Sequence, residues 1–408
     1  MLHSDLNNFY ASVESLFHPE LKGKPIAVAG DVEMRHGIVL AKSNEAKRCG
    51  VKTAEALWQA KQKCPEIVFV SPHYDLYEQY SQMAREIYFG YTDQVEPFGL
   101  DECWLDVSGS LSLFGSGRDI ADAIRKKIRK ELGLTVSVGV SFNKVFAKLG
   151  SDMKKPDATT EITLSNFRER VWGLPADEML FVGKQTYSKL KRYGIYTIGD
   201  LARADVGLLK CLFGKNGVLL NDYANGRDFS PVARFDATAS PKSIGNSTTP
   251  PRDLVSDEDI NIILYRLCES VSSRMRKGGF VCRTVQIYVR FSDLSTCERQ
   301  VKLEYPNRTS QSLFDAASYL LARHSITKIP IRSLGIRALD LLCQESEQLS
   351  FSPDIMRIQR NEAVERTVDV LREKYGNLSI KRGIMLTDTD LSTLTLGSAG
   401  ISLVDGSY

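Results

Sequence analysis

Two adjacent carboxylates in an apolar segment constrain the fold of this chain more than any other feature. Residues 97–109 read P-F-G-L-D-E-C-W-L-D-V-S-G, in which Asp101 and Glu102 stand between apolar side chains. Successive side chains of a strand point to opposite faces, so two neighbours cannot serve one site. A β-hairpin with strands at 94–98 and 103–107 removes this conflict, because the alternation breaks at its tip. We therefore expect Asp101 and Glu102 at or beside the tip of a hairpin.

A third carboxylate, Asp5, ends the first expected strand, in the segment S-D-L-N-N-F-Y. Beside the hairpin tip it would complete a cage of three carboxylates, which suits Mg²⁺ because this ion prefers hard oxygen ligands. Two metal ions in such a cage can hold the attacking and leaving oxygens of a phosphoryl transfer. Acidic residues at turns are most often simply solvated. Here, however, apolar strands on both sides place the pair at a half-buried edge, where like charges need a cation.

The composition excludes several classes of protein. The chain has 408 residues, of which 43% are apolar and 25% charged, so we expect several soluble domains. The eight cysteines are scattered and form no C-x-x-C pair, which argues against a zinc site and against a disulfide framework. No stretch has the length and apolar character of a membrane span, and the N-terminus lacks a signal-peptide pattern. We expect a cytoplasmic protein with no membrane partner.

Three regions follow one another along the chain. Up to about residue 164 the pattern is that of a mixed α/β domain with a subdomain inserted near 17–72. Residues 165–235 are helical, and 180–195 (L-F-V-G-K-Q-T-Y-S-K-L-K-R-Y-G-I) read as a helix, a glycine-bearing turn and a second helix. A third unit follows a linker. Beyond about residue 345 we expect one more helix at 355–375 and a flexible Ser/Thr/Gly-rich end.

The third unit alternates cleanly between apolar and polar residues. Val285, Ile287 and Val289 share one face of a predicted strand, while the opposite face carries Gln286, Tyr288 and Arg290, with Arg337 on the polar face of a later strand. Helices at 257–277 and 309–323 would cover the apolar face and leave the polar face open. Residues 266–337 contain 13 Lys+Arg and 5 Asp+Glu, although the whole chain carries only +3. The open face therefore suits a polyanion, although a solvated edge of an ordinary domain would look similar.

Three segments of the chain resemble the signature segments of Y-family translesion DNA polymerases, with most similarity to the bacterial DNA polymerase IV group. They are S-D-L-N-N-F-Y-A-S-V-E, G-L-D-E-C-W-L-D-V-S and S-V-G-V-S-F-N-K-V-F-A-K-L-G-S-D-M-K-K-P. The resemblance extends from residue 1 to about 345 and implies an α+β multidomain, right-hand architecture. The implied parts are a palm (1–16 and 73–164), fingers (17–72), a helix-hairpin-helix thumb (165–235), a linker (236–241), a little finger (242–345) and a tail (346–408).

The resemblance also implies roles for particular residues. Asp5 and Asp101 would bind two Mg²⁺ ions with help from the carbonyl of Leu6, and Glu102 would be the catalytic glutamate. Tyr10 would be the aromatic steric gate under the incoming sugar, although taken alone it also fits a core aromatic on an amphipathic helix. The main-chain amides of Asn7, Asn8, Phe9 and Tyr10 lie at a strand-to-helix turn, which is a natural cradle for phosphates. Lys155 would meet the triphosphate, although by itself it reads as a surface lysine.

Three segments depart from the family pattern. In the fingers, A-K-S-N-E-A-K places Asn44 and Lys47 where the family often has Tyr and Arg. Lys47 keeps the positive charge of the arginine but cannot make the two parallel hydrogen bonds of a guanidinium group. In the thumb, F-V-G-K keeps only Gly183 of the usual Gly-x-Gly turn, with Lys184 next to it, and would hold a DNA phosphate. In the tail, E-Q-L-S-F resembles a sliding-clamp peptide with one residue missing. Gln348, Leu349 and Phe351 would bind the clamp, with a chance match as the alternative.

These observations predict a template-directed DNA polymerase that adds dNMP to a 3′-OH and extends primers past damaged bases. Its expected partners are primer–template DNA, dNTP and a sliding clamp, and we expect a monomer. One alternative is a polymerase V-like subunit that needs accessory proteins. Another is a non-catalytic DNA-binding scaffold, against which the intact Asp5, Asp101 and Glu102 argue. A palm-fold nucleotidyl cyclase would share the metal chemistry but needs neither a helix-hairpin-helix nor a basic little finger.

Overall fold

The computed structural model describes residues 1–30, 37–235, 241–323, 326, 329–343 and 353–394. The described residues of Met1–Gly30 and Gly37–Thr238 form one compact unit, and those of Ala239–Tyr408 belong to a second. In the described part of the chain, no helix combines the length and apolar character that crossing a membrane requires.

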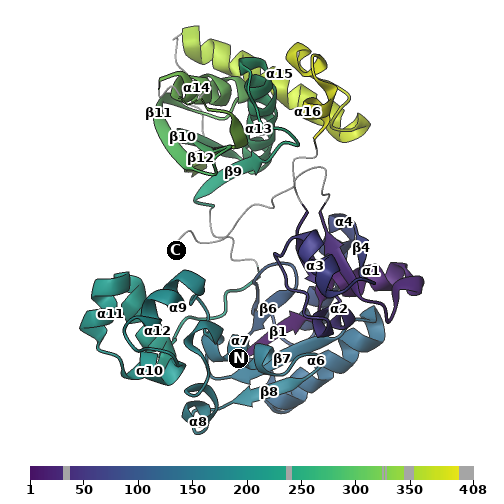
Figure 1. The fold of residues 1–408 in the computed structure, drawn as a ribbon, viewed down its shortest axis with the longest axis vertical. Coiled ribbons are helices and arrows are strands. Elements are labelled where there is room, and N and C mark those ends of the chain that lie inside the picture. The colour runs from purple at the N-terminus through teal and green to yellow at the C-terminus, as the bar shows by residue number, and fades with distance from the viewer. Residues whose placement is uncertain (31–36, 236–240, 324–325, 327–328, 344–352, 395–408) are drawn as a thin grey trace. The chain divides into compact units, whose positions relative to one another are not determined.

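A five-stranded sheet forms the centre of the first unit (Figure 1). Its strands, in spatial order, are β5 (Val95–Pro97), β6 (Glu102–Leu105), β1 (Leu2–Leu6), β7 (Val136–Ser141) and β8 (Thr159–Ile162). The hairpin expected around the acidic pair is confirmed, because β5 and β6 pair antiparallel. Strand β1 lies between β6 and β7 and is buried along its whole length.

Helices cover both faces of this sheet. Leu2 and Leu6 of β1 pack in one apolar cluster with Tyr77 and Ile124, which belong to α4 (Tyr74–Phe89) and α6 (Gly117–Leu132). His3 of β1 points the other way and contacts Ser151 of α7 (Lys144–Met153). The remaining helices of this part are α1 (Phe9–Phe17) and α5 (Leu111–Phe114). The two faces of β1 therefore meet different helices, as alternation requires.

A separate three-stranded sheet lies within the region expected to be the fingers. It has the order β3 (Val39–Lys42), β2 (Ile26–Ala29) and β4 (Val68–Val70), with the short helices α2 (Asn44–Arg48) and α3 (Leu57–Lys63). Ala27, Val39, Ala46 and Ala60 are buried together in a small core of its own.

The region expected to be the thumb is helical, but its turn differs from the expectation. Its helices are α8 (Phe167–Val171), α9 (Lys184–Lys191), α10 (Ile198–Arg203), α11 (Val206–Phe213) and α12 (Lys215–Ala224). Residues 180–195 thus contain one helix rather than two, and 180–183 form the turn before it. Phe181 has a positive φ of 69° in that turn, whereas Gly183 has an ordinary φ of −76°. Left-handed backbone at Phe181 is incompatible with the helix that its apolar neighbours suggested.

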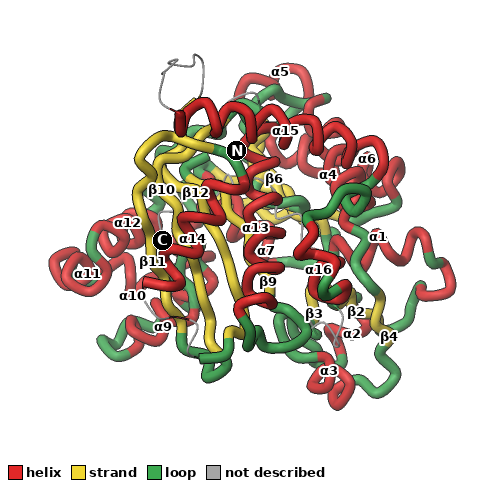
Figure 2. Tube along the Cα trace, turned by 90° about the horizontal axis from the view of Figure 1, so that it is seen from above, coloured by secondary structure: helices red, strands yellow, loops and turns green. Residues whose placement is uncertain are grey.

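The second unit is a four-stranded antiparallel sheet with helices on one face. The strands follow the order β11 (Thr296–Asn307), β10 (Phe280–Phe291), β12 (Ile331–Cys343) and β9 (Ser243–Thr248). Helices α13 (Asp257–Lys277) and α14 (Ser310–Arg323) run across it (Figure 2). Val285, Ile287 and Val289 lie in the core against them. The predicted helices and the predicted apolar face are therefore confirmed.

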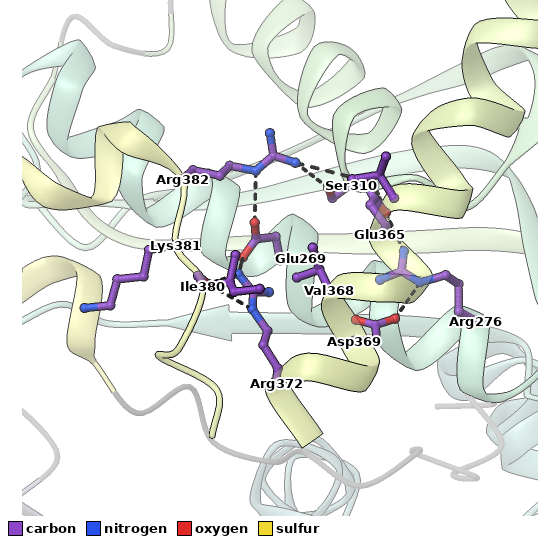
Figure 3. A pocket seen from close by; sticks show the side chains of 11 residues that line it. Glu269, Arg276, Ser310, Glu365, Val368, Asp369, Arg372, Ile380, Lys381 and Arg382 are labelled. Carbon is purple, nitrogen blue, oxygen red and sulfur yellow. Dashed lines mark hydrogen bonds and ion pairs between the residues drawn. The ribbon is translucent and has the colours of Figure 1, made fainter. Parts of the chain in front are cut away.

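The described residues 353–394 pack against this second unit. The expected helix is present as α15 (Pro353–Tyr375), and α16 (Thr389–Thr393) follows. Arg276 of α13 donates to Asp369 at 2.7 Å and also pairs with Glu365, and Arg372 pairs with Glu269 at 3.0 Å (Figure 3). Leu391 and Leu394 belong to the same core as the sheet. The described residues 353–394 thus extend this unit, and they include the start of the Ser/Thr/Gly-rich end that the sequence suggested to be flexible.

Candidate active site

The pairing of β1 with β6 brings two of the three carboxylates together. Asp5 is the direct antiparallel partner of Glu102. Both side chains face α7, since Asp5 contacts Lys155 just beyond that helix and Glu102 contacts Lys148 within it. The neighbours Leu6 and Cys103 point to the opposite face and lie in the apolar core. Glu102 therefore behaves as an ordinary strand residue, with its side chain on the polar side of the sheet.

Asp101 lies in the loop 98–101 and not in the strand, which resolves the conflict between adjacent carboxylates. Its carbonyl accepts a hydrogen bond from the amide of Leu6 at 2.9 Å, so the loop is attached to the end of β1. Gly99 in the same loop has φ +92°, a conformation that side chains rarely adopt. A methyl group built there would lie 3.6 Å from Oδ1 of Asp101. The hairpin tip thus places Asp101 beside the strand ends that carry Asp5 and Glu102.

Two lysines compensate the acidic site, one within α7 and one just beyond its end. Lys155 Nζ lies 2.6 Å from Oδ2 of Asp5, and Lys148 Nζ lies 2.7 Å from Oε2 of Glu102. Asp152 contacts both lysines, at 2.9 Å from Lys155 and 3.6 Å from Lys148. Helix α7 can approach this closely because of Gly139 in β7, where an added Cβ would lie 1.8 Å from the carbonyl oxygen of Ala147.

The three carboxylates have different pKa values because their surroundings differ. Burial raises the pKa of Asp5 to about 7, and the charges of Glu102 and Asp101 add to the rise while Lys155 opposes it. Burial also raises the pKa of Asp101, with a further contribution from Glu102. For Glu102, burial would raise the pKa, but the contact with His3 and the charge of Lys148 together lower it to about 2. Of the three carboxylates, Glu102 therefore keeps its negative charge to the lowest pH.

These residues fit a divalent metal ion by their chemistry, although they do not form a closed cage. Among the described residues, no three His, Cys, Asp or Glu side chains converge closely enough to hold a metal. Instead, the ammonium groups of Lys155 and Lys148 supply positive charge to Asp5 and Glu102. Carboxylate oxygens are the ligands that Mg²⁺ prefers. A metal ion bound here would therefore compete with these lysines for the carboxylate oxygens.

Sequence reasoning missed Lys148 and His3. Lys148, Asp152 and Lys155 are spaced by four and three residues, so a helix would place them on one face, and this spacing was a usable signal. His3 is fully buried, and its Nε2 lies 3.3 Å from Oε2 of Glu102 without the geometry of a hydrogen bond. It lies two residues before Asp5 in β1, so strand alternation places both on one face.

The turn from β1 into α1 brings together part of the expected phosphate cradle. Asn8 starts this turn with a left-handed backbone (φ 49°). The amide of Asn7 donates to the carbonyl of Thr135 at 2.9 Å and is therefore already used. Its side chain accepts a hydrogen bond from the amide of Asp157 at 2.8 Å, which ties the turn to the segment that follows Lys155. The expected cradle is thereby reduced to the amides of Asn8, Phe9 and Tyr10.

Tyr10 lies at the edge of the core, next to the acidic site. Phe9 is 3% exposed, whereas Tyr10 is only half-buried and stacks on Tyr77 with 4.2 Å between ring centroids. Burial raises the pKa of Tyr10 to about 12, and the nearby charge of Asp101 contributes. One face of the Tyr10 ring is therefore supported from behind, while part of the side chain reaches solvent close to Asp101.

The fingers residues are only partly connected to this turn. Asn44 begins α2, and its Oδ1 accepts a hydrogen bond from Nδ2 of Asn8 at 2.8 Å. Asn44 is thus linked to the expected phosphate cradle through a side chain. Lys47 lies in the same short helix and is exposed.

The expected DNA-binding residues lie in two places. Gly183 precedes α9 and Lys184 is its first residue, both exposed. In the second unit, Gln286 of β10 is the register partner of Arg337 of β12, and Tyr288 and Arg290 follow on the same face. Gln286 Nε2 lies 3.3 Å from Glu298, so this face also carries a carboxylate. The peptide with Gln348, Leu349 and Phe351 lies outside the described residues, as does nearly all of the linker 236–241.

Comparison with known proteins decides the family. The model of the impB/mucB/samB family matches residues 4–152, and that of the family's C-terminal domain matches residues 241–351. DNA polymerase IV of Acetivibrio thermocellus is 49% identical over 395 residues, which cover 97% of this chain and 99% of that protein. The chain belongs to the Y family of DNA polymerases. DNA polymerase IV 1 of Bacillus subtilis is 37% identical over 398 residues, with 96% of this chain and 94% of that protein covered.

Solved structures show the same fold at low identity. A Y-family DNA polymerase chimera of Dbh and Dpo4 superposes with a TM-score of 0.74 at 23% identity, covering 84% of this chain and 99% of that one. DinB from Sulfolobus solfataricus gives a TM-score of 0.56 at 24% identity, covering 84% of this chain and 98% of that one. The expected palm, fingers, thumb and little finger architecture is therefore confirmed, although the residue bounds of the domains stay predictions.

Membership of the Y family also settles the class of activity. The chain is a DNA-directed DNA polymerase of the translesion type, and enzymes of this type depend on divalent metal ions. The comparisons support this activity and not the alternatives of a non-catalytic scaffold or an accessory-dependent subunit.

Proposed function

We propose that this Y-family polymerase joins a deoxynucleotide to a primer 3′-OH with Asp5, Asp101 and Glu102 as its metal-binding and catalytic carboxylates. The observation that carries this proposal is the β1–β6 pairing, which sets Asp5 opposite Glu102 while the loop holds Asp101 beside both. The carbonyl of Leu6, at the end of β1, would complete the oxygen ligands. Two bound Mg²⁺ ions would activate the attacking hydroxyl and neutralise charge on the leaving pyrophosphate.

The incoming nucleotide would lie over the first turn of α1. The amides of Asn8, Phe9 and Tyr10 face the phosphates at the helix N-terminus, where the backbone favours negative charge. Lys155 adds a positive charge next to Asp5, and Lys47 with Asn44 would approach from the fingers. The Tyr10 ring, supported by Tyr77, would lie under the sugar and exclude a 2′-hydroxyl.

Primer–template DNA would be held through its phosphates at two surfaces. The first is the start of α9 at Gly183 and Lys184, and the second is the open sheet face with Gln286, Tyr288, Arg290 and Arg337. Phosphate contacts of this kind hold DNA without reading its sequence, which suits a polymerase that must accept any template. A sliding clamp would bind Gln348, Leu349 and Phe351, and the polymerase would act as a monomer.

Primer extension with the Asp101→Ala and Glu102→Ala variants tests this assignment. Each variant should lose several orders of magnitude in extension rate on undamaged and lesion-bearing templates, because electrostatic stabilisation dominates phosphoryl transfer. DNA binding, measured by fluorescence anisotropy, should persist. Asp93→Ala is the matched control, since Asp93 precedes β5, at the end of the hairpin away from its tip, and its side chain is 72% exposed. Extension at the wild-type rate by Asp101→Ala would refute the metal assignment.

A further inference from the structure

Helix α4 contacts the back of the hairpin tip that carries Asp101. The Ser81 hydroxyl donates a hydrogen bond to the carbonyl of Leu100, and Ser81 is 1% exposed. One turn later, Nη2 of Arg85 donates to the carbonyl of Gly99 at 3.2 Å. Residues four apart lie on one face of a helix, so α4 presents both donors to two consecutive carbonyls of the loop.

Two backbone hydrogen bonds hold the ends of the tip. The carbonyl of Asp101 accepts from the amide of Leu6 at 2.9 Å, and the amide of Phe98 donates to the carbonyl of Glu102 at 2.8 Å. Between these two points the backbone passes through Gly99, which has a positive φ and no side chain to restrict the backbone. The middle of the loop therefore depends on contacts from another element.

Packing holds part of the tip, because Leu100 packs against the core and Phe98 against Trp104, but the tip also borders an open groove. A groove of about 500 Å³ is lined by Ser81, Arg85 and Leu100 together with Phe89 and Phe235. The side chains of Leu100 and Phe98 are packed, while the carbonyls of Gly99 and Leu100 are held by hydrogen bonds from α4. These two hydrogen bonds add to the packing in opposing a shift of the backbone at 99–100.

We infer that Ser81 and Arg85 are positioning residues for catalysis, which hold the backbone at 99–100 so that Asp101 keeps its orientation toward Asp5. Neither side chain touches the reacting atoms, and both act through Asp101. This inference rests on the proposed role of Asp101 as a metal ligand. A displacement of a ligand by about 1 Å is enough to cost roughly 100-fold in rate, so the loss of either donor should be visible in catalysis.

The test uses two pairs of variants. Ser81→Ala and Arg85→Met remove the hydrogen-bond donor at each position, whereas Ser81→Thr and Arg85→Lys keep a donor there. Single-nucleotide incorporation should show a kcat lower by roughly 10- to 100-fold for the first pair, as for other residues that orient metal ligands. The KM for dNTP and the Kd for DNA should change less than about 2-fold, and the Mg²⁺ midpoint should rise. The second pair should recover most of the rate. Gln82→Ala, at an exposed position between the two, is the matched control and should behave as wild type.

Two further measurements do not depend on turnover. Direct Mn²⁺ binding by electron paramagnetic resonance, with a non-hydrolysable dNTP, should weaken in Ser81→Ala and Arg85→Met. Hydrogen exchange at the Leu6 and Phe98 amides should become faster. These measurements are made well below the melting temperature of each variant, and Ser81→Thr and Arg85→Lys replace the first pair wherever a variant of that pair does not fold.

The outcomes separate this inference from the proposal beneath it. If Asp101→Ala is inactive while Ser81→Ala and Arg85→Met match wild type in kcat and Mg²⁺ midpoint, the positioning role is refuted and the metal assignment stands. Lower melting temperatures with an unchanged Mg²⁺ midpoint and unchanged Mn²⁺ binding would make the two residues merely structural, which also overturns the inference. Full activity of Asp101→Ala would instead remove the assignment on which it rests.

Discussion

Tyr10 and Phe9 are neighbours in α1, but they face different surroundings. Phe9 is buried in the core, whereas Tyr10 is half-buried, stacked on Tyr77 and close to Asp101. A substitution at Phe9 should therefore act on stability, and one at Tyr10 on the substrate. The sequence alone left two interpretations of Tyr10 open, a steric gate and a core aromatic. A substitution that changes substrate choice would support the first, and one that changes only stability would support the second.

We predict that Tyr10→Ala opens a void where the ring would meet the 2′ position of the sugar. The ratio of rNTP to dNTP incorporation efficiency should rise ~100-fold, since removing a clash of a few kcal/mol corresponds to that factor. Phe9→Ala is the control, and it should lose about 3–5 kcal/mol of stability with both sugars equally impaired. A Tyr10→Ala ratio that stays flat while the melting temperature falls would identify Tyr10 as a core residue.

A second prediction concerns the pH dependence of stability. The pKa of Asp5 is raised to about 7 from the ordinary 3.8. The folded protein therefore holds a proton on Asp5 that the unfolded chain releases above about pH 4. The stability contributed by neutral Asp5 is present below that pH and is lost as the pH rises through 7. Without divalent metals, Asp5→Asn should thus be more stable than wild type at pH 8, and the difference should shrink toward pH 5.

Melting temperatures of both proteins between pH 5 and 8 provide the measurement. Asp119→Asn is the control, because the hydrogen bonds from Ser116 lower the pKa of that exposed carboxyl, so its effect should be constant over this range. A constant difference between Asp5→Asn and wild type would contradict the shifted pKa of Asp5.

Among the elements, the turn before α9 shows where local sequence misleads. Residues 180–195 were predicted to be a helix, a glycine-bearing turn and a second helix, yet Phe181 takes the left-handed conformation. In the family pattern this position is the first glycine of the Gly-x-Gly turn. The structure thus keeps the conformation that a glycine would favour and places an aromatic residue in it.

We therefore predict that at Phe181 the glycine variant is more stable than the alanine variant, which is the reverse of the usual order within a helix. A non-glycine residue in left-handed backbone costs about 1–2 kcal/mol, so Phe181→Gly should be more stable than Phe181→Ala by about 1 kcal/mol. At Ser188, exposed in the middle of α9, the alanine variant should be the more stable one by a similar amount. Urea unfolding of the four variants gives the comparison. The same order at both positions would show that Phe181 is not strained.

Local patterns were sufficient for most elements of the fold. The period of apolar residues located α13 and α14, and the alternation in β10 identified its buried face. The acidic pair was enough to locate the hairpin. The contacts of Lys148 with Glu102 and of α15 with α13 were not predicted, because they join residues far apart in the chain. A helical spacing shows which residues share a face but not what that face meets.

On the scale of the whole molecule, the proposed catalytic site and one of the two proposed DNA-binding surfaces, the open sheet face, lie in different units. The carboxylates belong to the first unit, and the open sheet face belongs to the second. A substitution in one should therefore leave the other function intact. The sequence predicted this division from the clustering of basic residues, but it gave no sign that α15 and α16 would extend the second unit.

The salt dependence of DNA binding tests this division. Each lost phosphate contact reduces the slope of log K against log salt by about one. The double variant Arg290→Ala with Arg337→Ala should thus flatten the slope by up to ~2 units and leave incorporation from bound DNA nearly unchanged. Arg203→Ala, an exposed arginine of α10 paired with Asp200, serves as the control. An unchanged slope in the double variant would move the DNA contact to another surface.

The lysines beside the carboxylates would compete with a metal ion for the proposed site. A divalent ion bound by Asp5 or Glu102 would gain less attraction, because it would weaken an existing ion pair. A Lys155 released from Asp5 would keep its contact with Asp152 and could also meet a triphosphate. Nucleotide and metal should consequently favour each other's binding, and by linkage the coupling must be equal in both directions. The protein would hold either one weakly and the pair tightly.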